Sequence, residues 1–279
     1  MSGISNWIGR AVRRELRRFD AELSLSQIER ARLRLELDKT PRFQDDKRLL
    51  KHEHQVFSQG GEDGAIREIF RRIGTTNRAF VELGVGDGLE NNTAFLLQQG
   101  WNGVWIEGDD DNARKIESTM APAISERRLT LVHRLLTIDN ALSSLPESLR
   151  SAPFDLLSID LDRNTLHIWK ALKSLQPRVA VIEYNAVWPA DLDYCVAYDA
   201  TKHWNGTSHF GASLKALESF GREIGYALVG CDSAGANAYF VSADLCADHF
   251  RAPFTAENHY EPIRYYLHGK AGHPRAFDG

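Results

Sequence analysis

Residues 56–245 alternate short apolar runs with amphipathic stretches. The apolar runs are rich in β-branched and aromatic residues and recur at intervals of roughly 25 residues, which leaves room for one crossover helix between successive strands. The predicted strands are Ala79–Leu83, Gly103–Glu107, Leu129–His133, Phe154–Asp160 and Val179–Glu183, and the predicted helices are Asn92–Gln99, Asp111–Thr119, Ser143–Arg150 and Leu166–Leu175. This repetition predicts a parallel doubly wound sheet that holds its ligands at the carboxyl ends of the strands.

The regular alternation of strands and helices is interrupted after the fifth predicted strand by an aromatic and polar stretch over residues 184–210. It resumes with a predicted helix at Ser213–Phe220. Two further predicted strands, Tyr226–Gly230 and Ala238–Val241, are separated by turn-prone residues that suit an antiparallel hairpin. The predicted fold class is therefore α/β: a Rossmann-like doubly wound sheet of about seven strands, mostly parallel, with an antiparallel last strand.

Both ends of the chain depart from this pattern. Apolar residues spaced by three and four from Ile8 to Leu23, with arginines mostly off that stripe, predict a basic amphipathic helix. A second helix is expected from a capping box at Ser26 and Glu29 until Pro41 stops it. We expect three parts: a helical N-terminal extension (1–55), a Rossmann-like domain (56–245) and an irregular C-terminal tail that packs on the domain (246–279).

Composition and charge limit the partners. The chain has 279 residues, is 43% hydrophobic and carries a formal net charge of -4, and it lacks the ~18 consecutive apolar residues of a membrane span, so we expect a cytoplasmic protein. Residues 1–55 hold 13 Lys/Arg against 9 Asp/Glu, whereas residues 56–279 hold 21 against 29. The acidic body argues against nucleic acid as a ligand. The basic extension would pack on the body, self-associate or contact an anionic membrane surface.

The segment VELGVGDG directly follows the first predicted strand and precedes a helix. Its glycines permit a tight turn and close approach of a ligand, while the helix presents unpaired N–H groups. The pattern is G-x-G-x-G, formed by Gly84, Gly86 and Gly88, with the acids Glu82 and Asp87 beside it. Acids repel a pyrophosphate but attract a sulfonium and an α-ammonium, which favours S-adenosylmethionine (SAM) over a dinucleotide.

A further acid ends the second predicted strand. Glu107 stands 19 residues beyond Gly88, where a carboxylate can accept hydrogen bonds from both hydroxyls of an adenosine ribose. This spacing alone would suit NAD equally well.

With these motifs the sequence resembles the class I SAM-dependent methyltransferases, and the resemblance covers residues 56–245. Their first motif is an acid followed by G-x-G-x-G after strand one. The matching residues here are Glu82, Gly84, Gly86, Asp87 and Gly88, and Glu107 matches the ribose-binding acid after strand two. The resemblance implies that these residues bind SAM and that the protein transfers a methyl group.

A closer similarity is to the FkbM-like branch, which carries an I-D-x-E-G element after strand four and an apolar strand ending in Glu. Residues 158–164 and 179–185 correspond to these elements, with Asp162 where Glu is usual and Arg163 where Gly is usual. The branch implies hydroxyl acceptors of sugars or polyketides. The lead-in SQGGEDG at residues 58–64 also looks like that of relatives and could cap the cofactor pocket.

Candidate catalytic residues follow the fourth and fifth predicted strands. Asp160 is assigned to cofactor or substrate positioning, and Asp162 to general base or metal ligand, although an acid here could also cap the next helix. Asp160, Asp162 and Glu183 could bind Mg²⁺ if they converge, but strand-end acids in such folds are more often hydrogen-bonded than metallated. His203 and His209, in the long loop, are further candidates for a general base.

The sequence therefore predicts an enzyme that transfers a methyl group from SAM to an oxygen, less readily a nitrogen, of a small-molecule or glycan-like acceptor. The alternatives are an NAD-dependent oxidoreductase and a non-catalytic scaffold with a degenerate cofactor pocket.

Overall fold

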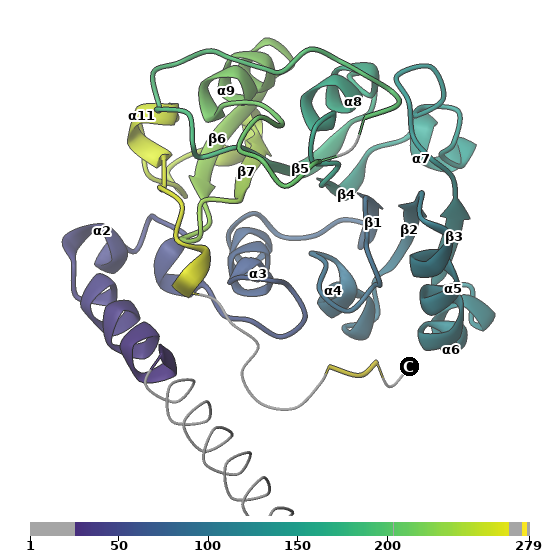
Figure 1. The fold of residues 1–279 in the computed structure, drawn as a ribbon, viewed down its shortest axis with the longest axis horizontal. Helices are drawn as coiled ribbons and strands as arrows, with labels where there is room; N and C mark the ends of the chain where they lie inside the picture. Colours follow the sequence, from purple (N-terminus) through teal and green to yellow (C-terminus); the bar gives the residue numbers. More distant parts are fainter. Residues whose placement is uncertain (1–25, 203, 268–274, 278–279) are drawn as a thin grey trace, which may run out of the picture.

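The computed structural model describes residues 26–202, 204–267 and 275–277. Within them one sheet has the strand order β3-β2-β1-β4-β5-β7-β6 (Figure 1). The strands are β1 (Ala79–Leu83), β2 (Asn102–Glu107), β3 (Leu129–His133), β4 (Phe154–Ile159), β5 (Pro177–Glu183), β6 (Tyr226–Cys231) and β7 (Asn237–Ser242). All seven lie within two residues of their predicted bounds, which confirms the α/β fold.

The direction of each strand follows from its connection. Strands β1 to β5 pair in parallel, whereas β7 pairs antiparallel with both β5 and β6. The predicted hairpin is therefore present, but its second strand inserts between β5 and β6, so that β6 forms the edge. Insertion buries both faces and both edges of the apolar strand β7.

Helices cover both faces of the sheet, with α3, α4 and α5 on one side and α8 and α9 on the other (Figure 1). Residues 26–38 are also helical. The remaining elements are α2 (Pro41–Gln44), η1 (Leu50–His52), α3 (Glu62–Ile73), α4 (Ala94–Gln98), α5 (Asp110–Thr119), α6 (Ala121–Ser125), α7 (Glu147–Ser151), α8 (Thr165–Ala171), α9 (Leu214–Glu223), α10 (Ala243–Cys246), α11 (Ala256–His259) and η2 (Tyr265–Leu267).

Alternate residues of the central strands fill two separate cores. Phe80 and Trp105 pack with residues of α3 and α4, whereas their neighbours Val81 and Ile106 pack with residues of α8 and α9. Successive side chains of a strand point to opposite faces, so a strand covered on both sides needs apolar residues at nearly every position. This requirement explains the continuous apolar runs of the sequence.

Proline moves two of the predicted helix ends. Helix α7 begins only after Pro146, because proline disfavours helical conformation in the preceding residue, and turns replace the start predicted at Ser143. Pro41 does more than stop a helix, since it occupies the first turn of α2, where its missing N–H costs nothing.

The two terminal parts are described only in places. The helix predicted between Ile8 and Leu23 lies outside the described residues. The tail from residue 246 includes α11 and η2, and the side chain of Phe277 is buried. Among the described residues, no helix has the length and apolar character that crossing a membrane requires.

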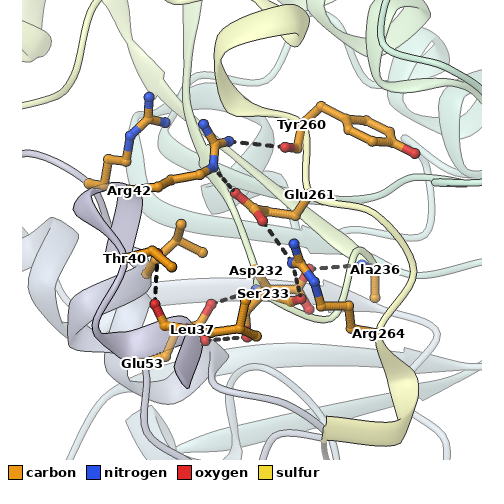
Figure 2. Close-up of polar contacts among 12 residues, drawn as sticks. Leu37, Thr40, Arg42, Glu53, Asp232, Ser233, Ala236, Tyr260, Glu261 and Arg264 are labelled. Atoms are coloured by element: carbon orange, nitrogen blue, oxygen red, sulfur yellow. Dashed lines mark hydrogen bonds and ion pairs between the residues drawn. The ribbon is translucent and has the colours of Figure 1, made fainter. Parts of the chain in front are cut away.

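Ion pairs and hydrogen bonds join the N-terminal helical segment, the turn after β6 and the C-terminal segment (Figure 2). The buried Glu261 carboxylate binds Arg42 Nε at 2.6 Å and Arg264 Nη1 at 2.8 Å. The carboxylate of Glu53, which is equally buried, accepts hydrogen bonds from Arg34 at 2.9 Å and from Ser233. These contacts fix the β6–β7 turn between segments from both ends of the chain.

We predict that Glu261→Ala lowers the free energy of unfolding by about 3 kcal/mol, because it leaves two guanidinium groups without their buried partner. Urea unfolding followed by tryptophan fluorescence measures this. Glu257→Ala is the control, since Glu257 pairs with Lys215 at 3.0 Å on the surface and its loss should cost less than about 1 kcal/mol. Equal losses in the two variants would contradict a structural role for this junction.

Candidate functional site

A cavity of about 750 Å³ lies at the carboxyl ends of the parallel strands. It is lined by the loops that follow β1, β2 and β4, including Gly84, Gly86, Glu107 and Asp160. Proteins with a doubly wound sheet bind their ligands at this position. All the cofactor-binding residues proposed from the sequence line this cavity except Gly88.

Glycine is required where the loop after β1 approaches the loop after β4. Gly84 has a φ of 78°, and a Cβ at this position would lie 1.7 Å from the carbonyl oxygen of Asp160. Gly88 has a φ of 80°, and a Cβ there would meet the Trp105 ring at 2.9 Å. Gly86 also has a positive φ, but a Cβ there would meet nothing within 4 Å. Glycine is therefore needed at positions 84 and 88 for the loop to pack against its neighbours. At Gly86 the lack of a side chain leaves the space beside the loop free for a ligand.

The Glu107 carboxylate holds the glycine loop in place. Its Oε2 accepts hydrogen bonds from the backbone N–H groups of Val85 at 3.0 Å and Gly86 at 2.8 Å, and its Oε1 accepts one from Asp109 at 2.8 Å. Because each carboxylate oxygen has two lone pairs, Oε1 can accept one further hydrogen bond. Glu107 thus joins the loops after β1 and β2 on the wall of the cavity.

The Glu82 carboxylate is engaged by hydrogen bonds from the protein itself. Its buried carboxylate accepts hydrogen bonds from Asn91, from the backbone of Asn92, and from the backbone and hydroxyl of Thr93. Burial raises the pKa of Glu82, and these hydrogen bonds oppose that rise. Glu82 therefore fixes the segment that leads into α4. Asp87 accepts a hydrogen bond from the backbone of Leu89 at 3.1 Å.

Three acids converge beside the glycine loop. One carboxylate oxygen each of Asp160, Asp162 and Glu183 lie within 4.8 Å of one another, although the residues come from the ends of two strands. The Asp160 and Glu183 carboxyls hydrogen-bond to each other, and Glu183 also accepts a hydrogen bond from the Thr165 hydroxyl at 3.1 Å. Asp162 has a φ of 50°, an uncommon conformation that aspartate tolerates better than most residues.

Crowding and burial change the protonation of this cluster. Desolvation, followed by repulsion from Asp162, raises the pKa of Asp160 to about 7. Desolvation and the charge of Asp160 raise the pKa of Glu183 well above its usual range. The two carboxyls therefore favour sharing a proton over ionising together, because like charges at this distance disfavour double ionisation.

A second cavity, of about 340 Å³, adjoins the first. The residues common to both are Gln59, Glu62, Glu90, Asp160 and Asn237. Asp160 and Glu183 lie on its wall, together with residues from the β6–β7 turn and the C-terminal segment. The acidic cluster thus stands where the two cavities meet.

Of the two candidate histidines, the structure describes only His209. His203 lies outside the described residues. His209 is exposed and absent from the lining of either cavity. The long loop is instead anchored by Asn185, which donates hydrogen bonds to the carbonyls of Ser208 and Phe210.

Several residues that line the two cavities are not among the site residues expected from the sequence. Arg134 and Lys202 line the first cavity, and Tyr265 and Arg275 line the second. No local motif marks them, because they reach the cavities only through folding of distant segments. The SQGGEDG lead-in did carry a signal, and its residues Gln59 and Glu62 line both cavities.

Comparison with known proteins gives only distant similarities. No protein-family model matches the sequence, and no curated protein matches it. The N-terminal domain of EvdMO1, solved in the presence of SAH and D-fucose, has 15% identity and a TM-score of 0.41, with 65% of this chain and 82% of that chain covered. A putative O-methyltransferase from Klebsiella pneumoniae has 18% identity and a TM-score of 0.40, with 63% and 76% covered.

An O-methyltransferase from Bacillus cereus, solved in complex with SAH, has 16% identity and a TM-score of 0.36, with 58% of this chain and 66% of that chain covered. Similarities of this size do not assign an activity to this chain.

The buried carboxyl pair of Asp160 and Glu183 predicts a specific pH dependence of the free energy of unfolding. A carboxyl whose pKa is raised by folding keeps its proton in the folded state after the unfolded chain has released it, so stability falls as pH rises towards about 7. Between about pH 5 and pH 7, the free energy of unfolding of the wild type should fall relative to that of Asp160→Asn, by up to about 1.4 kcal/mol per pH unit.

Chemical unfolding across that pH range measures the difference. The exposed Asp139→Asn is the control and should follow the wild type. Parallel curves for the wild type and Asp160→Asn would rule out the shared proton.

Proposed function

We propose that the protein is a SAM-dependent methyltransferase. The observation that carries this proposal is the charge of the first cavity: among its described lining residues, eight carry carboxylates and two, Arg134 and Lys202, are cations. Lys202 is already paired with Asp199 at 3.1 Å. A pyrophosphate would be repelled by such walls, whereas a nucleoside that carries a sulfonium and an ammonium would be attracted. This argues against the NAD-dependent alternative.

The residues present fit SAM. Glu107 would accept a ribose hydroxyl through the free capacity of Oε1, and the open approach at Gly86 would admit the nucleoside close to the backbone. The acids around Asp160 would face the positively charged end. When bound, SAM supplies an electrophilic methyl group.

The reaction proposed is transfer to an oxygen of a small-molecule or glycan-like acceptor, as in the FkbM-like branch that the sequence resembles. The acceptor would occupy the second cavity, which adjoins the first at Asp160. Positioning of the two reactants is the main requirement of such a displacement. Asp162 would take the proton of the acceptor hydroxyl, while Asp160, bound to Glu183, would position the acceptor.

The same three acids fit a second role as ligands of Mg²⁺, because their oxygens converge within 4.8 Å and Mg²⁺ prefers carboxylate oxygen. We favour proton sharing over a metal because burial and mutual repulsion raise the pKa of both Asp160 and Glu183. Cytoplasmic location, and contact of residues 1–55 with a membrane surface or a second copy, stay predictions from the sequence.

We expect Glu107→Ala to weaken binding of S-adenosylhomocysteine (SAH) by about tenfold or more, because it removes a ribose acceptor and frees the glycine loop. Isothermal titration with SAM, SAH and NAD measures this, with the exposed Glu117→Ala of α5 as control. Saturable binding of NAD alone would overturn the proposed function, and an unchanged SAH affinity would reject the role of Glu107.

For the acidic cluster, we expect millimolar Mg²⁺ to raise the unfolding temperature of the wild type no more than that of Asp162→Asn. A chelator should likewise leave methyl transfer unchanged, since Asp162 acts as a base. A Mg²⁺-dependent rise that is lost in Asp162→Asn would instead assign a metal to the three acids.

A further inference from the structure

The part of the second cavity wall formed by the β6–β7 turn contains hydrogen-bond acceptors without donors. Asp232 and Asn237, at the β6–β7 turn, both line it and are only 1% and 6% exposed. Asp232 Oδ1 accepts hydrogen bonds from the backbone of Ala236 at 2.8 Å, which Figure 2 shows, and of Asn237 at 2.9 Å. Its Oδ2 has no partner.

Asn237 repeats this pattern. Its side-chain amide group donates to Glu62 Oε1 at 3.0 Å, which fixes the orientation of the side chain. Its Oδ1 is buried and has no hydrogen-bond partner. Two neighbouring residues therefore each present one unsatisfied buried oxygen, an arrangement that costs free energy unless a donor is supplied.

The charge of the cavity indicates what kind of donor is needed. Five carboxylate residues line this cavity, namely Glu62, Glu90, Asp160, Glu183 and Asp232. Arg275 is the only cation among its described lining residues, and it is already engaged by Glu90 at 3.4 Å and by the carbonyls of Leu89 and Ser58. Among the described lining residues of this cavity, acids therefore outnumber cations.

We propose that this part of the cavity wall binds a protonated amine, and therefore that the methyl acceptor is a small hydroxylated molecule that carries an ammonium group. An ammonium brings three N–H donors and one positive charge, which suit Asp232 Oδ2, Asn237 Oδ1 and the nearby Glu62 carboxylate. A neutral hydroxyl brings a single donor and no charge. The identity of the acceptor rests on the proposed methyltransferase function, whereas the amine site itself does not.

A metal ion is disfavoured at this part of the wall. Within the described residues, the acids that converge closely enough to hold an ion are Asp160, Asp162 and Glu183, and Asp232 is not among them. Glu62 and Asn237 both line the two cavities, so the amine site borders the first cavity. An acceptor held by its ammonium at Asp232 would thus extend towards Asp160 and the methyl donor.

The test uses the full chain saturated with SAH and a panel of primary amines, each paired with the alcohol of the same skeleton. The panel contains amino hexoses with their parent hexoses, and alkylammonium ions with alkanols. Saturation-transfer NMR at neutral pH reports binding of each probe. The variant is Asp232→Asn, which keeps an oxygen for the Ala236 and Asn237 N–H groups but removes the charge and replaces Oδ2 with an N–H donor.

We expect the amines to bind at least about tenfold more tightly than their neutral partners, and Asp232→Asn to remove most of this preference. The affinity for SAH, measured by titration, should stay within about twofold in the variant, which shows that the fold and the first cavity are intact. The exposed Asp191→Asn is the matched control and should keep the preference.

Equal binding of amines and alcohols, or a preference that survives in Asp232→Asn, would overturn the amine site. Failure of the wild type to bind SAH would overturn the proposed function instead. The amine panel gives its answer in either case, so the two failures are distinguishable.

Discussion

The close approach of the loops after β1 and β4 is the constraint on which the site depends. Asp160 donates its backbone N–H to the carbonyl of Leu83 at 2.9 Å, and the next residue, Gly84, lies so near the Asp160 carbonyl that no side chain fits between them. Gly84 in turn donates to Ile106 at 3.0 Å. Three strand ends are thereby held together, and whatever side chains follow them must share one small volume.

That shared volume explains the electrostatics. Elsewhere in the described structure some buried acids are compensated by cations, as Glu261 is by Arg42 and Arg264. At the carboxyl ends of the strands the acids face one another, and Asp160 and Glu183 keep a proton between them. Uncompensated buried charge costs folding free energy. Such a cost is typical of a site that a positively charged ligand completes.

The hydrophobic pattern predicted the strands well because both faces of the central sheet are covered. A strand such as β4 must then be apolar throughout, and this leaves a clear signal in the sequence. The helices were predicted less well where proline decides their ends, as at Pro146. The glycine loop and Glu107 were also predicted, since each follows its strand directly and a strand end is a position that the sequence reveals.

The sequence by itself determined the sheet, the glycine loop and the acids that follow the strands, because local spacing fixes each of them. Only the tertiary structure decided that Glu183 meets Asp160, that Glu82 accepts hydrogen bonds from the segment leading into α4, and that Arg275 and Asp232 line a common cavity. These outcomes depend on contacts between segments far apart in the chain. Hydrophobic burial sets those contacts through the whole fold, and no short stretch of residues encodes them.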